Sequence, residues 1–168
     1  VRASDQDKVY LVSTMSGNDA SVDPGNWVDT MYFWADSDEV VSVSVENENG
    51  RIDLERDLGG PWTLGQAGPE DVVDQAEAEA VANRASAIRM LAPLGNEEFD
   101  TYLLGDPAAV ITVETRNSSG ASEILVLRIG DPDDPNVGYV AKSSATPYFV
   151  VLADFEVRGV VEKAAGDL

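Results

Sequence analysis

The sequence predicts an α+β fold, in which an antiparallel sheet carries one long helix on a face and a short helix follows at the C-terminus. Three patterns in the 168 residues indicate this fold class: an alternating run that leads into an Asn-Gly turn, a stretch of helical periodicity between two prolines, and four apolar runs joined by short loops. The hydrophobic content of 43% lets a chain of this length bury a core without disulfide bonds.

A hairpin is predicted at residues 40 to 55. Residues 40 to 46 alternate apolar and polar side chains, which places the valines of this run on one face. The following Asn49-Gly50 pair is typical of a two-residue type I′ turn, so we expect a second strand to return directly. In the register that this turn sets, Val45 faces Leu54.

A long helix is predicted between Pro69, which is tolerated in a first helical turn, and Pro93, which stops a helix before it. Acidic residues fill its first half and arginines its second, the order that complements the helix dipole. Spacing near 3.6 residues predicts a buried face made of Val73, Ala76, Ala80, Ala87, Ile88 and Leu91.

Four apolar runs in the second half of the chain predict four strands. The runs are Val110 to Glu114, Glu123 to Ile129, Val137 to Lys142 and Tyr148 to Leu152. The loops between them are short, so we expect an antiparallel meander. Ile124 to Ile129 is apolar on both alternations, which favours a central position. Asp154 is placed to cap a final helix over Phe155 to Ala164.

Charge and composition exclude several classes of function. Asp and Glu number 31 against 11 Lys and Arg, a formal charge of −20, so the surface repels nucleic acid and anionic membranes. The chain has no histidine and no cysteine, which removes disulfides, thiolate and imidazole catalysis and the usual zinc and copper ligands. We therefore expect no cofactor. No apolar stretch reaches the length of a membrane span, so we expect any membrane segment to lie upstream of Val1.

An ordered set of motifs carries a resemblance to a known family. After the hairpin come Trp62, the long helix, the Tyr102, Leu104 and Pro107 segment, Ile129-Gly130, Gly138-Tyr139-Val140 and Tyr148-Phe149-Val150-Val151. This order resembles the bacterial family called domain of unknown function 4340. The resemblance implies tandem units behind an N-terminal membrane anchor, often encoded beside gliding-motility-type ABC transporter components. It implies no catalytic residues. The family usually has glycine before the leucine of the tyrosine segment, whereas here Gly105 follows Leu104.

The same resemblance implies how the chain divides. Val9 to Val12 is similar to the last strand of a unit, and Trp27-Val28-Asp29 is similar to the connector that leads into the next copy. We therefore expect residues 1–37 to be the tail of a preceding repeat unit with its connector. Residues 38–168 then form one α+β unit.

Two local clusters are candidate binding sites. The aromatic residues Trp27, Tyr32, Phe33 and Trp34 suit either a partner-binding platform or packing under the sheet, since aromatic faces supply large contact area. The loop after Gly130 gathers oxygen-bearing side chains of the kind that bind calcium, and it equally suits a solvated, proline-ordered turn. The side chains of this candidate calcium site are Asp131, Asp133, Asp134 and Asn136.

The sequence as a whole predicts a non-catalytic, extracytoplasmic accessory module of a membrane-tethered protein, linked to a transport or surface-motility system. Its expected partners are proteins, transporter components among them. A calcium-dependent surface or adhesion domain is the alternative. A hydrolase with paired carboxylates is a third reading, because acidic pairs are the one catalytic option that this composition leaves open.

Overall fold

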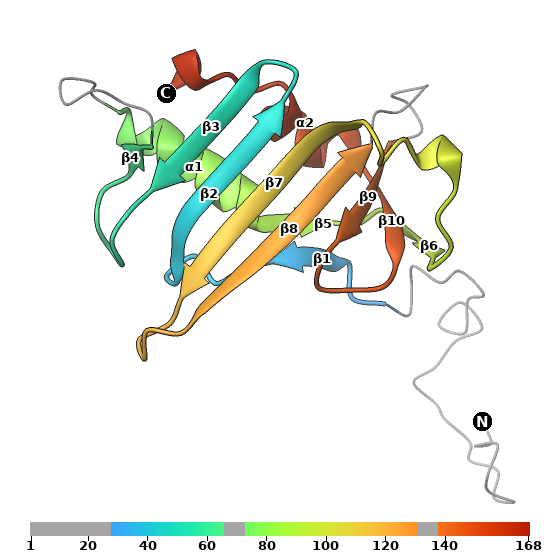
Figure 1. The fold of residues 1–168 in the computed structure, drawn as a ribbon, viewed down its shortest axis with the longest axis horizontal. Helices are drawn as coiled ribbons and strands as arrows, with labels where there is room; N and C mark the ends of the chain where they lie inside the picture. The colour runs from blue at the N-terminus through green and yellow to red at the C-terminus, as the bar shows by residue number, and fades with distance from the viewer. Residues whose placement is uncertain (1–27, 66–72, 131–137) are drawn as a thin grey trace, which may run out of the picture.

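The computed structural model describes residues 28–65, 73–130 and 138–168, which form an eight-stranded antiparallel sheet, a two-stranded sheet and two α-helices (Figure 1). The strands of the large sheet lie in the order β4-β3-β2-β7-β8-β9-β10-β6. Their bounds are β2 Val40–Asn47, β3 Gly50–Glu55, β4 Thr63–Leu64, β6 Ala92–Gly95, β7 Pro107–Arg116, β8 Ser122–Gly130, β9 Tyr139–Ser143 and β10 Phe149–Leu152. The remaining elements are β1 Met31–Trp34, β5 Ala87–Arg89, α1 Gln75–Ser86, α2 Asp154–Val161 and the 3₁₀ turns η2 Asp100–Tyr102 and η3 Ala165–Asp167.

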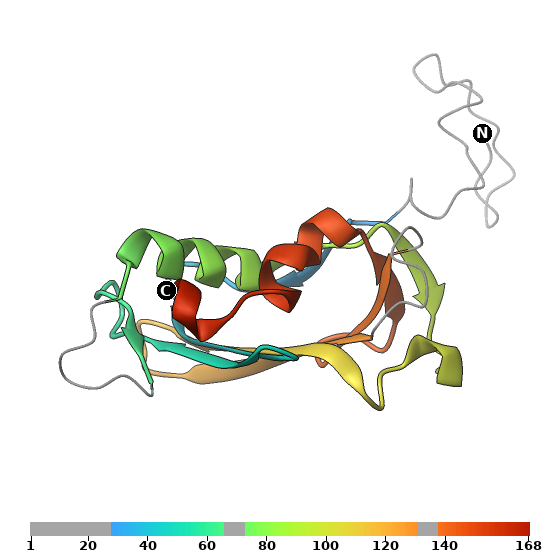
Figure 2. The same cartoon turned by 90° about the horizontal axis from the view of Figure 1, so that it is seen from above.

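The helices α1 and α2 pack against each other and against β2 and β7, so both cover the same face of the sheet. Figure 2 shows the helix layer on one side and the curved sheet on the other. Alternate residues of the central strands point to the helices and make the core, chiefly Val43, Val45, Ile52, Leu54, Ile111, Val113, Leu127 and Ile129. The α+β class is confirmed, and β7 to β10 follow one another in chain and sheet as the predicted meander.

The strands β2 and β3 form the predicted hairpin in a different register. Val45 pairs with Ile52 rather than Leu54. A shift of two residues keeps the same side chains on the inner face, because the side-chain period of a strand is two. Glu48 and Asn49 are the two central residues of the turn, and neither has a positive φ. Gly50, which follows them, has a φ of 113°. The turn is therefore not type I′, which needs positive φ at both central residues.

In this register the turn contacts the end of α2. The side-chain amide of Asn47 donates hydrogen bonds to the carbonyl oxygens of Val160, at 3.0 Å, and Lys163, at 2.8 Å. The last carbonyls of a helix have no partners within it, so these bonds stabilise the helix end. Asn47 Oδ1 also accepts a hydrogen bond from the backbone N–H of Asn49 at 2.8 Å, which closes the turn.

The helix α1 is shorter than predicted and buries a different face. It begins after Asp74, whose side chain accepts a hydrogen bond from the backbone N–H of Ala76 at 2.9 Å. It ends at Ser86, because the next residues pair as β5 with β1. The predicted face was fixed by Ile88 and Leu91, which lie beyond the helix, and its Ala76, Ala80 and Ala87 are exposed. The buried residues are Ala78, Val81, Ala82, Ala85 and Ser86.

Trp62 joins the segment after β3 to α1. Its indole N–H donates a hydrogen bond to Glu79 at 2.7 Å. The Arg56 guanidinium lies 4.2 Å from the centre of the ring and pairs with the same carboxylate at 3.2 Å. The backbone N–H and C=O of Trp62 both bond to the Gln75 side-chain amide at 2.8 Å. Trp62 is therefore a buried residue that holds the segment after β3 against α1.

Two smaller expectations are also corrected. The helix α2 spans Asp154–Val161, and Ala153 rather than Asp154 is its N-cap residue. The Asp154 carboxylate instead pairs with Arg158 at 2.5 Å, one helical turn further on. The strand β8 is interior as predicted, but Ile124 is 62% exposed because its side chain lies on the sheet face opposite the helices.

The strand β1 contributes to the same core. Phe33 is 1% exposed and Ala35 is also buried, although both precede the predicted boundary at residue 38. The predicted strand at Val9 to Val12 lies outside the described residues. The division of the chain into a preceding tail and one unit stays a prediction.

Candidate interaction surface

An apolar groove of 330 Å³ lies between the start of the described chain, the β5–β6 junction and the turn before β10. Most of its lining is hydrophobic or aromatic, which is typical of surfaces that bind other molecules. Tyr148, on its rim, is 54% exposed. The lining residues are Val28, Asp29, Met31, Tyr32, Met90, Pro93, Thr146, Tyr148 and Val150.

The hydroxyl of Tyr32 fixes one wall of the groove to the other. It donates a hydrogen bond to the carbonyl oxygen of Tyr148 at 2.5 Å and accepts one from the backbone N–H of Ser143 at 2.9 Å. Burial raises the pKa of this phenol above its usual value of 10.0, while the hydrogen bond from Ser143 acts in the opposite direction. Tyr32 is therefore neutral at physiological pH and remains a donor to Tyr148.

Replacing Tyr32 with phenylalanine is expected to lower the free energy of unfolding by about 1–3 kcal/mol, since the N–H of buried Ser143 loses its partner. The folded pKa lies above the unfolded one, so the hydroxyl contributes fully below about pH 10. That contribution is lost as pH rises through the folded pKa. Denaturant midpoints at neutral and alkaline pH measure both effects. Tyr148→Phe is the control, because it removes a hydroxyl from an exposed ring; equal losses in both variants would contradict the assignment.

The three candidate aromatic residues that the structure describes lie in different environments. Tyr32 lines the groove, Phe33 is in the core, and Trp34 is 58% exposed, while Trp27 lies outside the described residues. Neighbouring residues of a strand point to opposite faces, which separates Phe33 from both of its neighbours.

The structure adds residues to the surface that sequence reasoning did not assign to it. Met90 was predicted to lie in the long helix and Pro93 to end it, and Thr146 lies in the short loop between the last two predicted strands. Tyr148 was predicted only as the first residue of a strand, with no role in binding. Its position beside Tyr32 is a contact between residues 116 apart, for which the sequence carries no local signal.

The candidate calcium residues Asp131, Asp133, Asp134 and Asn136 all lie outside the described residues. Within residues 28–65, 73–130 and 138–168, no group of three or more acidic side chains is arranged to hold a metal ion. The calcium site therefore stays a prediction.

Calorimetric titration of the whole chain with calcium at physiological ionic strength tests that loop. We expect weak or no binding, because proline-ordered loops commonly keep their acidic side chains solvated. A saturable site that disappears when Asp133 and Asp134 are both replaced by alanine would establish the calcium site instead.

Comparison with known proteins places the chain in a family without supplying an activity. Among the described residues, no helix is both long and apolar enough to cross a membrane. No curated protein and no solved structure matches the sequence. A sequence model of the family described as domain of unknown function (DUF4340) matches residues 1–104, more than half of the chain, and the protein therefore belongs to this family.

Proposed function

We propose that the chain is a non-catalytic interaction module of a membrane-tethered, extracytoplasmic protein that serves a transport or surface-motility system. The observation that carries the interaction role is the apolar groove between Tyr32 and Tyr148. Exposed aromatic side chains beside apolar walls supply contact area at low entropic cost, as at protein interfaces. The location and the system come from the family resemblance. The strongly acidic composition favours protein partners over nucleic acid.

The occupant that we assign to the groove is the neighbouring unit of the same protein. Val28 and Asp29 line the groove and also begin the segment that leads into β1. A unit joined through this segment is held beside the groove by covalent attachment. Short tethers give effective concentrations in the millimolar range, about 1 mM, which favours docking even where the contact area is modest. Such docking would make the joint between consecutive units rigid.

Site-specific photo-crosslinking in the full-length, membrane-associated protein tests this assignment. A photoreactive residue at Tyr148 should form crosslinks within one polypeptide, to peptides that precede Val28. The same residue at Ile124, exposed on the opposite face of the sheet, is the control and should not. The assignment fails if both positions crosslink equally, or if Tyr148 captures only other proteins or a second copy.

The extracytoplasmic location is tested separately by labelling an introduced cysteine. The chain contains no cysteine of its own, so the introduced thiol is its single labelling site. Ile124→Cys places a single thiol at an exposed position. In intact cells, a membrane-impermeant maleimide should label the peptide that carries this thiol. Labelling that appears only after lysis would place the module inside the cell and remove the extracytoplasmic part of the proposal.

A further inference from the structure

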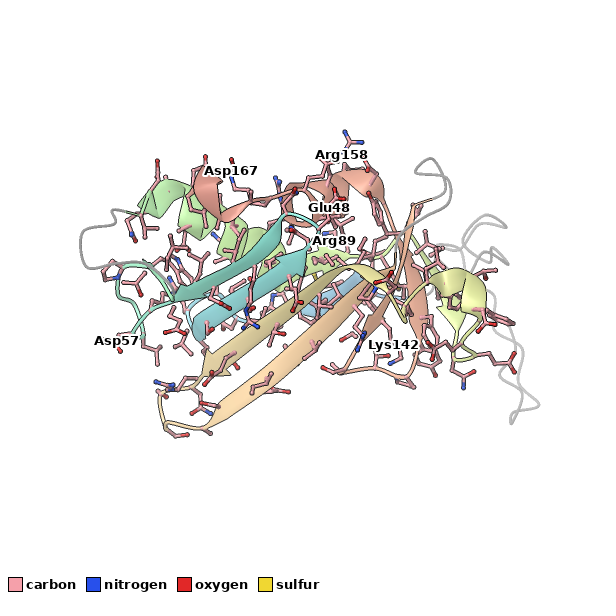
Figure 3. The ribbon with its side chains drawn as sticks, turned by 45° about the horizontal axis from the view of Figure 1, so that its top comes forward. Glu48, Asp57, Arg89, Lys142, Arg158 and Asp167 are labelled. Atoms are coloured by element: carbon pink, nitrogen blue, oxygen red, sulfur yellow. The ribbon has the colours of Figure 1, made fainter. Side chains whose placement is uncertain are left out.

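The turn between β2 and β3 is hydrogen-bonded to the C-terminal end of α2 through the side-chain amides of Asn47 and Asn49, a contact that we call the clasp. Besides the bonds from Asn47, the Asn49 side-chain amide donates to the carbonyl oxygen of Glu162 at 2.9 Å. Figure 3 labels Glu48 in this turn and Arg158 on α2, the two elements that these hydrogen bonds join. Every contact in this clasp uses an amide N–H as the donor and a helix-end carbonyl as the acceptor, so it depends on both side chains remaining amides.

Asn49 is also followed by Gly50, and this is the single Asn-Gly pair in the 168 residues. Both residues are exposed. The space that a side chain at Gly50 would occupy is empty, with no atom within 4 Å. No side chain at position 50 hinders the approach of the Asn49 side chain, and glycine allows the main-chain rotations that bring its own nitrogen to that side chain.

We propose that Asn49 is a self-modification site, at which the chain converts its own amide into a carboxylate and thereby opens the clasp. The nitrogen of Gly50 attacks Cγ of Asn49 and forms a C–N bond, which closes a five-membered imide. The bond from Cγ to Nδ2 breaks, and the amide group leaves as ammonia with the proton lost by Gly50. Water then opens the imide at either carbonyl, which yields aspartate or isoaspartate at position 49.

The product cannot make the clasp contact. A carboxylate at position 49 has no hydrogen to donate to the carbonyl of Glu162, so two acceptors face each other. It also adds negative charge at the C-terminal end of a helix, where the dipole disfavours it. The side chains of Glu48 and Glu162 already bring like charge to this edge.

The C-terminal tail transmits this opening to α1. Lys163, whose carbonyl oxygen accepts one of the clasp bonds, pairs through its side chain with Glu77 at 3.1 Å. The carbonyl of Leu168 accepts a hydrogen bond from the backbone N–H of Asp74 at 2.8 Å. Modification at position 49 therefore loosens residues 162–168 and the first turn of α1, while the sheet keeps its own hydrogen bonds.

Ageing the purified chain at mildly alkaline pH tests the first step. Peptide mass spectrometry should show conversion of Asn49 several-fold faster than conversion of Asn117, which serves as an internal control in another turn. Asn49→Gln keeps an amide but would need a larger ring, so it should stay unconverted. If Asn49 converts no faster than Asn117, the modification site is overturned.

Hydrogen exchange tests the second step. The variant Asn49→Asp should lose protection in residues 162–168 without ageing, and aged chain should lose it in proportion to conversion. Asn117→Asp adds the same charge but should leave the protection of residues 162–168 unchanged. Asn117 Oδ1 accepts hydrogen bonds from Ser119 and Ala121, a role that a carboxylate keeps. If Asn49→Asp retains normal protection of the tail, the opening of the clasp is overturned.

Discussion

Replacing Gly130 with alanine is expected to destabilise the protein by about 3 kcal/mol, the upper end of the usual range for overpacking. A methyl group at this position would fall on the backbone carbonyl of Tyr102 and also crowd Leu103. The obstruction is main chain and cannot rotate away. The η2 segment would have to lift off β8, and the Tyr102 ring would leave Phe149, whose ring centre lies 5.4 Å away.

Gly105→Ala is the matched control for this substitution. It lies in the connection that follows η2, the segment that Gly130 contacts, has no positive φ, and a methyl group there meets no atom within 4 Å. We expect a change within about 0.5 kcal/mol. Denaturant midpoints of both variants measure the difference. Equal midpoints would show that η2 does not pack against Gly130 in solution.

Replacing Phe33 with alanine is expected to cost about 3–5 kcal/mol, the usual range for removing a buried aromatic ring. Phe33 is 1% exposed and belongs to the core between the helices and the sheet. Trp34, its neighbour in β1, is 58% exposed. Trp34→Ala should therefore lower the free energy of unfolding far less than Phe33→Ala, although it removes the larger ring. Urea unfolding of the two variants decides this. A larger loss at Trp34 would mean that the two faces of β1 are exchanged.

The same measurement bears on the predicted boundary at residue 38. A chain that starts at Asp38 lacks both β1 and the Phe33 ring. The family match also runs across this position, from residue 1 to residue 104. Folding of the shortened chain with an unchanged midpoint would support the boundary, and loss of folding would place β1 inside the unit.

Local patterns predicted the elements of this fold better than their ends. The alternating valines and Asn49-Gly50 were sufficient for the hairpin. The predicted register was wrong, and the observed register places Asn47 in hydrogen-bond contact with α2, more than 100 residues later, which turn preferences do not contain. The helix was extended too far because Ile88 and Leu91 continued its periodicity by coincidence, whereas pairing with β1 makes Ala87–Arg89 a strand.

The candidate surface was less predictable than the fold. The aromatic side chains among residues 27 to 34 predicted rings that are either packed in the fold or offered to a partner, and the structure places Tyr32 in the lining of the groove. The opposite wall, with Pro93 and Tyr148, is assembled by the order of strands in the sheet. Short loops predicted the order of β7 to β10, but the pairing of β6 with β10 is a long-range contact that spacing along the chain does not encode.

The bond from Asp74 to Leu168 has a consequence for how the protein is made. The bond from Asp74 to Leu168 cannot form until residue 168 has left the ribosome, and the bonds of the β2–β3 turn form only once α2 has been made. Joining residues about 100 positions apart costs conformational entropy before the contacts between them form, so we expect these contacts to form slowly and late in folding. During that interval the apolar strands are exposed, which is the state of a chain that chaperones recognise.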